Sequence, residues 1–219
     1  MNGIELLVAV SPLTGPLIIA GIVFTVVVII PGLYTLTIYN GLRRAQVRAQ
    51  NAFSQIDVQL KRRFDLIPNL VESVKGYMAH ERSTLEAVIN ARAQCASALG
   101  ATGGGTMMGA ATVGALANAS GALDGALHRM IGLVERYPEL KANQNALQLQ
   151  EELASTENRI AFARQAYNDS VMRLNESIVV FPSSIIANFF SIEPMGLFEA
   201  TAGERASVAG QQCFVLDYC

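Results

Sequence analysis

The stretch LIIAGIVFTVVVIIPGLYTLTI, residues 17–38, decides the fold of this chain. It lies within a longer run, residues 6–42, that contains no Asp, Glu, Lys or Arg. A transmembrane helix needs about 20 predominantly apolar residues, and residues 17–38 supply that length. The sequence therefore predicts an N-terminal segment, residues 1–42, that crosses a membrane once at about residues 17–38.

The charges on either side of the apolar run predict its orientation. Arg43 and Arg44 follow it directly, whereas the only charged residue before it is Glu5. Because basic residues favour the cytoplasmic side, we expect the N-terminus outside and the rest of the chain in the cytoplasm. A cleaved secretory signal is the alternative, but its basic start, shorter apolar core and small-residue cleavage site are not evident. Pro31 predicts a kink in the span, because proline removes a helical hydrogen bond.

Length and composition fit one modest domain after the span. The chain has 219 residues and a formal net charge of −2, with 16 basic and 18 acidic residues. This balance gives no reason to expect nucleic-acid binding. Cys95, Cys213 and Cys219 form neither a CxxC pair nor a disulfide framework, and cytoplasmic thiols stay reduced. We therefore assign the cysteines no redox or metal role.

Apolar residues recur at alternating steps of three and four after the span, which predicts a long helix with one buried stripe. We expect this helix to end near Phe64, because Asp65 can cap a new helix and Pro68 would lie in its first turn. A second helix would then run to about Leu99. The stripe of the first helix, which begins inside the apolar run, consists of Ile38, Leu42, Ala45, Ala49, Ala52 or Phe53, Ile56 and Leu60.

The middle of the chain has weaker helical signals. Residues 100–121 are rich in Gly, Ala, Thr and Ser, and each interior glycine costs about 1 kcal/mol relative to alanine. We expect a loop at residues 103–105 and a third helix from Met107 or Thr112 to Arg136. The Tyr137-Pro138 step should end it, since a residue before proline avoids the helical region.

The fourth predicted helix has the clearest periodicity. It begins near Asn143 and ends at Phe181-Pro182, and its regular stripe indicates continuous packing. The aromatic residues that follow should pack across one end of the helices or lie on the membrane, with little regular structure from Thr201 onward. The stripe is Leu149, Leu153, Thr156, Ile160, Ala163, Tyr167, Val171, Leu174 and Ile178, and the aromatic segment contains Ile185, Ile186, Phe189, Phe190 and Phe198.

Three sequence blocks resemble the LemA family. The first is YNGL at residues 39–42, followed by AFSQIDVQLKRRFDLIPNLV at residues 52–71. The second is YPELKAN at residues 137–143, followed by LQLQEEL at residues 147–153. The third is ENRIAFAR at residues 157–164, followed by Tyr167-Asn168 and Phe181-Pro182. The resemblance covers about residues 34–199, in the order found in the family.

The resemblance implies an all-α protein of the bacterial inner membrane, with an N-terminal transmembrane helix followed by a long antiparallel four-helix bundle in the cytoplasm. The bundle and its aromatic segment would occupy residues 43–199, and an irregular tail residues 200–219. The resemblance implies no reaction. The apolar Gly-Met-Ala segment near residue 108 and the tail ending in CFVLDYC depart from the family pattern.

The sequence lacks the motifs of catalysis, metal binding and cofactor binding. His80 and His128 lie on different expected helices, and His80-Glu81 lacks the second histidine of an HExxH site. There is no Gly-Lys-Ser/Thr, no Gly-x-Ser-x-Gly elbow and no Glu-x-x-His pair. A Cys95 nucleophile would need a positioned base. We therefore predict that the protein is not an enzyme and binds no cofactor or metal.

A polar cluster at the expected turn between the first two helices is one candidate interaction site. In one interpretation it is a helix corner, in which Asp65 caps free N–H groups and the basic residues complement the helix dipole. In the other it docks another protein, since arginine pairs bidentately with carboxylates. The cluster consists of Asp57, Gln59, Lys61, Arg62, Arg63, Asp65 and Asn69.

Glycines provide a second candidate site. Gly105 and Gly109, and likewise Gly121 and Gly125, have the Gly-x-x-x-Gly spacing that lets helices approach closely. Residues 94–123 carry no charge, which predicts either a mobile loop or a segment for self-association or lipid contact. Self-association would make the protein a homo-oligomer.

Two classes of function follow from these features. We favour a non-catalytic, membrane-tethered scaffold that binds lipid and associates with itself or with other envelope proteins. The alternative is an accessory or regulatory subunit of a membrane enzyme such as a protease, acting through the basic corner. Membrane shaping by the aromatic segment is a third hypothesis.

Overall fold

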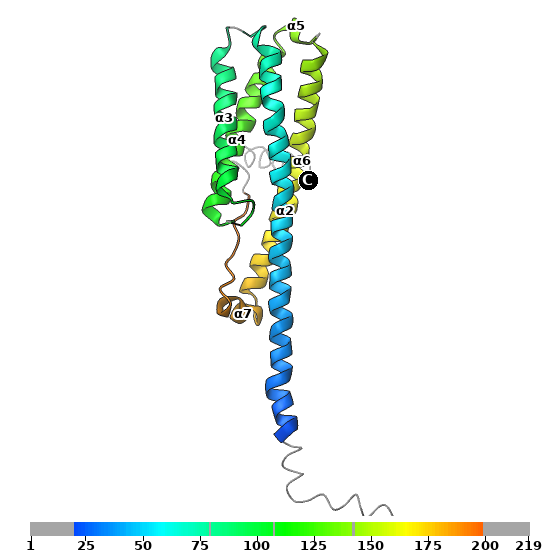
Figure 1. Ribbon diagram of the computed structural model, residues 1–219, viewed down its shortest axis with the longest axis vertical. Coiled ribbons are helices and arrows are strands. Elements are labelled where there is room, and N and C mark those ends of the chain that lie inside the picture. Colours follow the sequence, from blue (N-terminus) through cyan, green and yellow to red (C-terminus); the bar gives the residue numbers. More distant parts are fainter. Residues whose placement is uncertain (1–19, 79, 107, 142, 199–219) are drawn as a thin grey trace, which may run out of the picture. The chain divides into compact units, whose positions relative to one another are not determined.

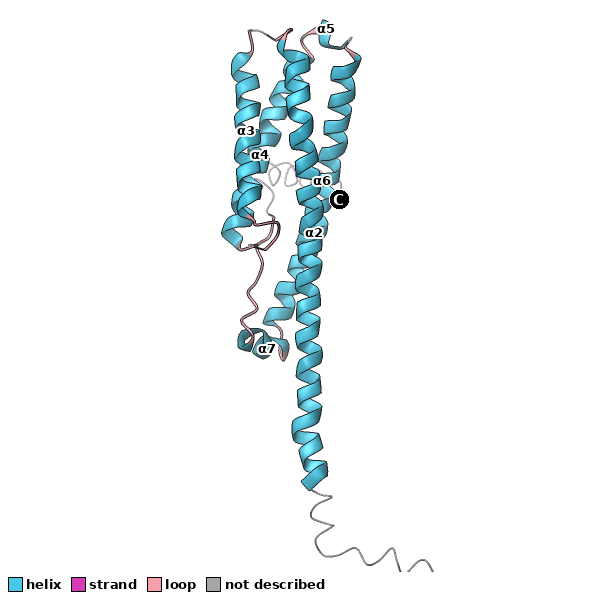
Figure 2. Cartoon of the chain, in the orientation of Figure 1, coloured by secondary structure: helices cyan, strands magenta, loops and turns pink. Residues whose placement is uncertain are grey.

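All of the regular structure in the described part of the chain is helical, and Figure 2 shows the helices joined by loops. This computed structural model describes residues 20–78, 80–106, 108–141 and 143–198. The start of the predicted span and the predicted tail at residues 200–219 lie outside the described residues. In chain order the elements are η2 (Thr25–Ile29), α2 (Ile30–Lys75), α3 (Arg82–Ala101), α4 (Ala110–Val134), α5 (Pro138–Lys141), α6 (Gln144–Val179) and α7 (Ser183–Phe189), labelled where there is room in Figure 1.

The chain divides into two compact units. The first consists of Met1–Arg44 and Ser177–Ile192, and the second of Ala45–Glu176 and Glu193–Cys219. Each unit has its own cluster of buried apolar side chains.

The first unit contains the apolar segment that the sequence predicts as a membrane span. It begins the helix Ala20–Lys75, which among the described residues is the one helix long and apolar enough to cross a membrane. Residues 20–37 are all exposed, and large apolar side chains point out on every side of the helix. A helix that is apolar all round is stable in an apolar surrounding. Its length and composition agree with the predicted N-terminal anchor.

A π-helical turn precedes Pro31 in the apolar segment. η2 covers Thr25–Ile29, and the N–H of Ile30 donates to the carbonyl of Thr25, five residues earlier. Proline has no N–H to donate and crowds the preceding turn. The wider π-helical turn accommodates this loss within a continuous helix. A change in the helical hydrogen-bond pattern therefore lies just before Pro31, and the kink itself stays a prediction.

α7, which the sequence did not predict as a helix, packs on the last part of the charge-free run in the first unit. Ile186, Ala187 and Ile192 form a buried cluster with Leu42. The aromatic segment therefore has a packed side as well as an exposed one.

Tyr39 lies beside this apolar cluster. Its ring lies against Phe190, with ring centroids 4.5 Å apart. Arg43 donates from Nε to the Tyr39 hydroxyl at 3.0 Å, and its guanidinium lies 5.4 Å from the centre of the Tyr39 ring. The first basic residue after the apolar run is thus held against an aromatic ring.

In the second unit, α2, α3, α4 and α6 contribute side chains to one apolar core. Phe53 of α2 meets Tyr167 of α6 edge to face, with ring centroids 5.7 Å apart. Fully burying one large apolar side chain contributes roughly 1.5–3 kcal/mol. The predicted stripe of α6 is confirmed: Leu153, Thr156, Ile160, Tyr167, Val171 and Leu174 are buried, and Leu149, Ala163 and Ile178 are half-buried.

The predicted end of the first helix at Phe64 is wrong, because α2 continues to Lys75. Asp65 is therefore inside a helix and does not cap one. The apolar stripe continues in phase after Phe64, and Ile67 and Val74 are fully buried. Since tertiary packing of an apolar face supplies most of the stability of a helix in a protein, this stripe favours continuation over a break.

Pro68 lies in the interior of α2 instead of in the first turn of a new helix. A proline at this position leaves the carbonyl of Phe64, four residues earlier, without its usual donor. Arg92 of α3 supplies a substitute, because its Nε donates to the Phe64 carbonyl at 2.8 Å. The hydrogen bond that proline removes from α2 is thus replaced by one between α2 and α3.

The other predicted boundaries agree closely with the structure. The loop at residues 103–105 is confirmed. Its three glycines have φ angles of 57°, 67° and 93°, which residues other than glycine rarely adopt. α6 begins one residue after Asn143, whose Oδ1 accepts the N–H groups of Asn145 and Ala146 at 3.1 and 3.3 Å. Asn143 therefore caps α6.

Residues 193–198 form an extended strap in the second unit that asparagine side chains hold to α6. Asn175 accepts the N–H of Met195 at 3.0 Å and donates to its carbonyl at 2.9 Å. Asn168 makes the same pair of bonds with Phe198, at 2.8 and 2.9 Å. Each amide thus satisfies a donor and an acceptor of the strap backbone, as a neighbouring strand would.

Gly196 lets the strap approach the start of α4. The Gly196 N–H donates to the Met108 carbonyl at 2.8 Å, and the Gly196 carbonyl accepts the Tyr167 hydroxyl at 2.6 Å. A Cβ at Gly196 would lie 2.6 Å from the Cα of Ala110. Only glycine fits this crossing.

Candidate functional site

The predicted docking cluster lies along α2 and not at a turn. Because α2 continues to Lys75, its connection to α3 is at residues 76–81. The predicted corner is therefore misplaced. The residues concerned are Asp57, Gln59, Lys61, Arg62, Arg63, Asp65 and Asn69.

Two exposed members of this cluster, Lys61 and Arg62, make ion pairs at the surface. Lys61 lies 2.8 Å from Asp57 one turn earlier, and Arg62 lies 3.9 Å from Glu152 of α6. Exposed pairs of this kind contribute about 0–1 kcal/mol. Whether these side chains dock a partner stays a prediction.

Arg63 is different, because it belongs to a buried layer of polar side chains. Its side chain is 3% exposed. We call this set of residues, which comes from the four helices of the core, the buried polar layer. It consists of Arg63 of α2, Cys95 of α3, Ser120 and Asp124 of α4, and Glu157 and Arg164 of α6.

Two carboxylates meet the Arg63 guanidinium. One of its terminal nitrogens forms an ion pair with Asp124 of α4, and the other with Glu157 of α6. A buried charge is tolerated when it is paired and hydrogen-bonded. Arg63 therefore ties α2 to α4 and to α6.

Arg164 approaches the same Asp124 from α6. It lies 3.5 Å from Asp124 Oδ2 and donates to the Ser120 hydroxyl at 2.6 Å. Its guanidinium stacks 4.7 Å from the ring centre of Phe198, in the strap. The layer thus balances two guanidinium groups with two carboxylates.

The pKa of the Cys95 thiol is raised to about 11, mainly by burial and next by the Asp124 carboxylate. Arg63, a hydrogen bond with Ser120, and Arg164 act in the opposite direction. Because nucleophilic cysteines act as thiolates, a thiol with this pKa is a structural group. Burial also raises the pKa of Tyr167, whose hydroxyl donates a hydrogen bond to the Gly196 carbonyl.

Sequence reasoning missed the buried polar layer, although a signal for it exists. Arg63 lies three residues after Leu60 and four before Ile67, so it occupies a core position of the α2 stripe. A basic residue on an apolar stripe requires an acidic partner on a facing helix. Identifying that partner requires the packing of the helices.

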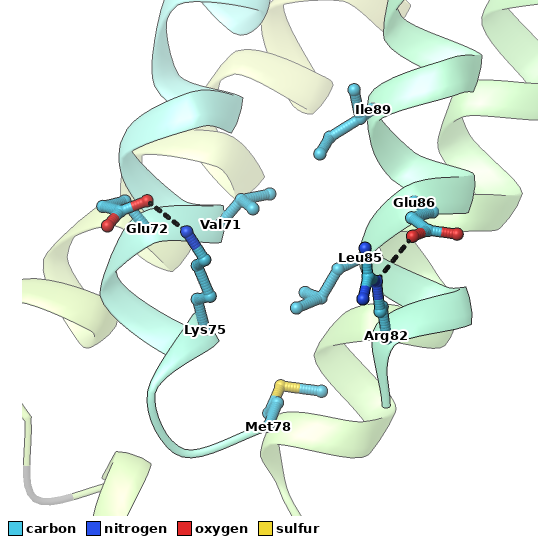
Figure 3. A pocket seen from close by; sticks show the side chains of 8 residues that line it. All are labelled: Val71, Glu72, Lys75, Met78, Arg82, Leu85, Glu86 and Ile89. Carbon is cyan, nitrogen blue, oxygen red and sulfur yellow. Dashed lines mark hydrogen bonds and ion pairs between the residues drawn. The ribbon is translucent and has the colours of Figure 1, made fainter. Parts of the chain in front are cut away.

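An open pocket lies where α2 ends and α3 begins, and Figure 3 shows its lining. Its volume is about 560 Å³. Lys75 lies 3.7 Å from Glu72, and Arg82 donates to Glu86 at 2.9 Å, so each ion pair stays on its own helix. A concave surface with apolar and charged parts suits a protein partner. The lining consists of Val71, Met78, Leu85, Ile89, Glu72, Lys75, Arg82 and Glu86.

The glycine pairs lie in different settings. Gly105 is in the turn after α3 with a φ of 93°, and Gly109 directly precedes α4. That pair does not lie on one helix face, and its part in self-association stays a prediction. Gly121 and Gly125 both lie within α4 and are half-buried. Self-association through α4 stays a prediction.

The histidines lie outside the buried polar layer. His80 is exposed in the turn before α3, and His128 is exposed on α4 with its Nδ1 2.9 Å from the Asp124 carbonyl. Within the described ranges, no group of three or more His, Cys, Asp or Glu residues could hold a metal ion.

Comparisons with known proteins identify relatives of this chain. The model of the LemA family matches residues 52–210. The chain is 28% identical to magnetosome protein MamQ of Magnetospirillum gryphiswaldense over 79% of this chain and 69% of that protein. It is 27% identical to protein LemA of Metamycoplasma hominis, with 77% and 72% covered. Magnetosome protein MamQ 2 of Paramagnetospirillum magneticum is 27% identical, with 79% and 69% covered.

Proposed function

Because the chain belongs to the LemA family, we propose that it is a membrane-anchored helical scaffold that associates with itself or with other envelope proteins and performs no catalysis. The helix Ala20–Lys75 carries this proposal. Its first part exposes apolar side chains on every side, and its later part supplies a core stripe of the second unit. Such a helix can hold a folded body to a bilayer.

The body would be an antiparallel four-helix bundle on the cytoplasmic side of a bacterial inner membrane. α2, α3, α4 and α6 share one core, and short connections favour antiparallel neighbours. Arg43, Arg44 and Arg48 follow the apolar run, which favours the cytoplasm for the body. The LemA family and the MamQ relatives support a membrane-associated helical protein.

Crosslinking in native membranes tests the proposed association. The full-length protein should be recovered mainly with other copies of itself, and mass measurement in mild detergent should give oligomers. Recovery of monomers alone, with no other envelope protein attached, would contradict the scaffold.

Protease accessibility tests the proposed orientation. Protease added to intact spheroplasts should leave the body uncut, and lysis should make it accessible. A body that is cleaved in intact spheroplasts would place it outside the cell membrane.

The pocket between α2 and α3 favours one second candidate, an accessory subunit that docks a membrane enzyme such as a protease. The pocket combines apolar Val71 and Ile89 with charged side chains from both helices. Under this function, crosslinking should recover an enzyme in a fixed ratio to this chain. Arg82→Glu should abolish that recovery, whereas Arg159→Glu on exposed α6 surface should not. Equal recovery with both variants would exclude the pocket as the docking site.

A further inference from the structure

α7 and the residues around it expose apolar side chains on the side away from their packing partner. Ile186 and Ala187 are buried with Leu42, whereas Phe181 is 75% and Phe189 81% exposed. Apolar side chains of this segment therefore lie both in a packed cluster and on the exposed surface. We call the exposed set the aromatic patch: Val179, Val180, Phe181, Ile185, Phe189 and Phe190.

No charged residue interrupts this segment. Ser177–Ile192 contains no Asp, Glu, Lys or Arg, and Glu176 and Glu193 flank it. Large exposed apolar patches are rare on soluble monomers and mark contacts with proteins or membranes. The patch therefore requires a partner with an apolar surface.

The residues on which α7 packs indicate what the aromatic patch contacts. Ile38 and Leu42 belong to the end of the charge-free run, and Arg43 is the first charged residue after it. A helix over residues 20–42 measures about 34 Å at about 1.5 Å per residue. The hydrocarbon core of a bilayer is roughly 30 Å thick. Leu42 therefore reaches the level of the headgroups when the run spans the bilayer.

The contacts of Tyr39 are also typical of a residue at the level of the lipid headgroups. Its ring packs on Phe190, and Arg43 both donates to its hydroxyl and stacks on its ring. Aromatic side chains with a polar tip, and basic residues beside them, gather where the hydrocarbon meets the headgroups. α7 is packed at this point of the same compact unit as the apolar helix.

We propose that the aromatic patch is a second membrane-contact element, which inserts into the bilayer interface beside the transmembrane helix. The proposal rests on the anchoring proposed above for the apolar run. Lipid is the occupant, because the patch belongs to the same unit as the apolar helix and packs on the end of its charge-free run. Interfacial segments of this kind bury their apolar face about 5–10 Å into the bilayer.

The chain contains no tryptophan, so a single introduced tryptophan reports its own surroundings. We would reconstitute three full-length variants into phosphatidylcholine and phosphatidylglycerol vesicles, with and without brominated acyl chains. Phe189→Trp places the probe in the patch and Phe24→Trp places it in the apolar helix. Phe162→Trp is the matched control, because Phe162 is 74% exposed on α6 in the second unit.

We expect brominated lipid to remove most of the fluorescence of Phe189→Trp and Phe24→Trp, and little of that of Phe162→Trp. Bromines near the headgroups should quench Phe189→Trp more strongly than bromines deep in the acyl chains. Quenching of Phe189→Trp no greater than that of Phe162→Trp would overturn the proposal. A blue-shifted emission without lipid quenching would overturn it in favour of a second copy.

The Phe24→Trp variant separates this inference from the anchoring. If Phe24→Trp is quenched and Phe189→Trp is not, the anchor stands and the interfacial contact fails. If Phe24→Trp is not quenched, the anchor itself fails. Should Phe189→Trp not accumulate, Ile185→Trp carries the same test, because Ile185 is also exposed on α7.

Discussion

The aromatic patch and the buried polar layer both reverse the usual distribution of side chains, in opposite directions. At the patch, Phe181 and Phe189 are exposed. In the layer, Arg63 and Asp124 lie among the apolar residues of a core. Charged residues are almost never fully buried unless they are paired, and large apolar patches are rarely exposed.

The difference between the two regions lies in where the partner is found. Arg63 meets two carboxylates of its own chain, so folding alone completes its interactions. Apart from the contact of Phe190 with Tyr39, the patch is exposed among the described residues, so folding of this part of the chain does not cover it. Changes in the layer should therefore alter stability in any medium, whereas changes in the patch should matter where lipid is present.

The largest effect should come from Arg63→Ala, which leaves Asp124 and Glu157 without their shared cation. Breaking a buried ion pair by removing one partner typically costs about 3–5 kcal/mol. We expect the free energy of unfolding to fall by that amount. Urea unfolding of the full-length protein in mild detergent, followed by circular dichroism, measures it.

Arg62→Ala is the matched control for Arg63→Ala, because Arg62 is the neighbouring residue and is exposed. Its cost should stay within about 0.5 kcal/mol. Arg63→Lys should restore only part of the loss, since lysine lacks the fork that contacts two carboxylates. Equal costs for Arg62→Ala and Arg63→Ala would show that the layer does not stabilise the fold.

The next effect concerns the strap, which brings Phe198 against Arg164 of the layer. Asn168→Ala removes both side-chain hydrogen bonds to the Phe198 backbone. Leaving a buried polar group unsatisfied costs about 1–3 kcal/mol, so we expect a loss of about 2–3 kcal/mol and faster proteolysis at residues 193–198. Asn158→Ala on exposed α6 surface should change neither quantity, and strap cleavage that is equally slow in both variants would contradict the role of Asn168.

A smaller effect on the free energy of unfolding should come from Arg92→Ala, and its size should depend on Pro68. Arg92→Ala removes the donor to the Phe64 carbonyl, and a hydrogen bond from a charged group contributes about 1.5–3 kcal/mol. In a Pro68→Ala background, the new N–H at residue 68 can donate to that carbonyl, so Arg92→Ala should then cost less than about 1 kcal/mol. A double-mutant cycle measures the coupling between the two residues. Equal costs of Arg92→Ala in both backgrounds would show that Arg92 does not replace the backbone donor that Pro68 lacks.

The sequence predicted the elements that depend on local pattern. The apolar run, the glycine turn at residues 103–105 and the regular stripe of α6 each follow from residue type and spacing alone. The break at Phe64 was wrong because capping and proline signals are local, whereas the stripe through Ile67 and Val74 is stabilised by packing. The Arg92 donor that makes Pro68 tolerable is 28 residues from Phe64 in sequence.

The candidate site was less accessible to sequence reasoning for the same reason. Arg63 was included in the predicted cluster but was grouped with its exposed neighbours Lys61 and Arg62. Its position on the α2 stripe separates it from them, yet its partners Asp124 and Glu157 lie on other helices. Identifying a buried ion pair requires knowing which helix faces meet.

The smallest effect should be the contribution of Cys95 to alkaline stability. The folded thiol has a pKa of about 11, against 9.0 for an unperturbed thiol, so unfolding favours its ionisation as the pH rises. Below pH 9.0 the thiol is protonated in both states, so the free energy of unfolding is at its full value. It then falls progressively toward pH 11, and the loss is roughly 1 kcal/mol at about pH 10. Cys95→Ala should therefore lose less stability than the unmodified chain between those values, in unfolding curves measured at each pH. Because burial also raises the pKa of Tyr167, both proteins should keep a further loss at higher pH, and parallel pH profiles throughout would show that Cys95 does not contribute.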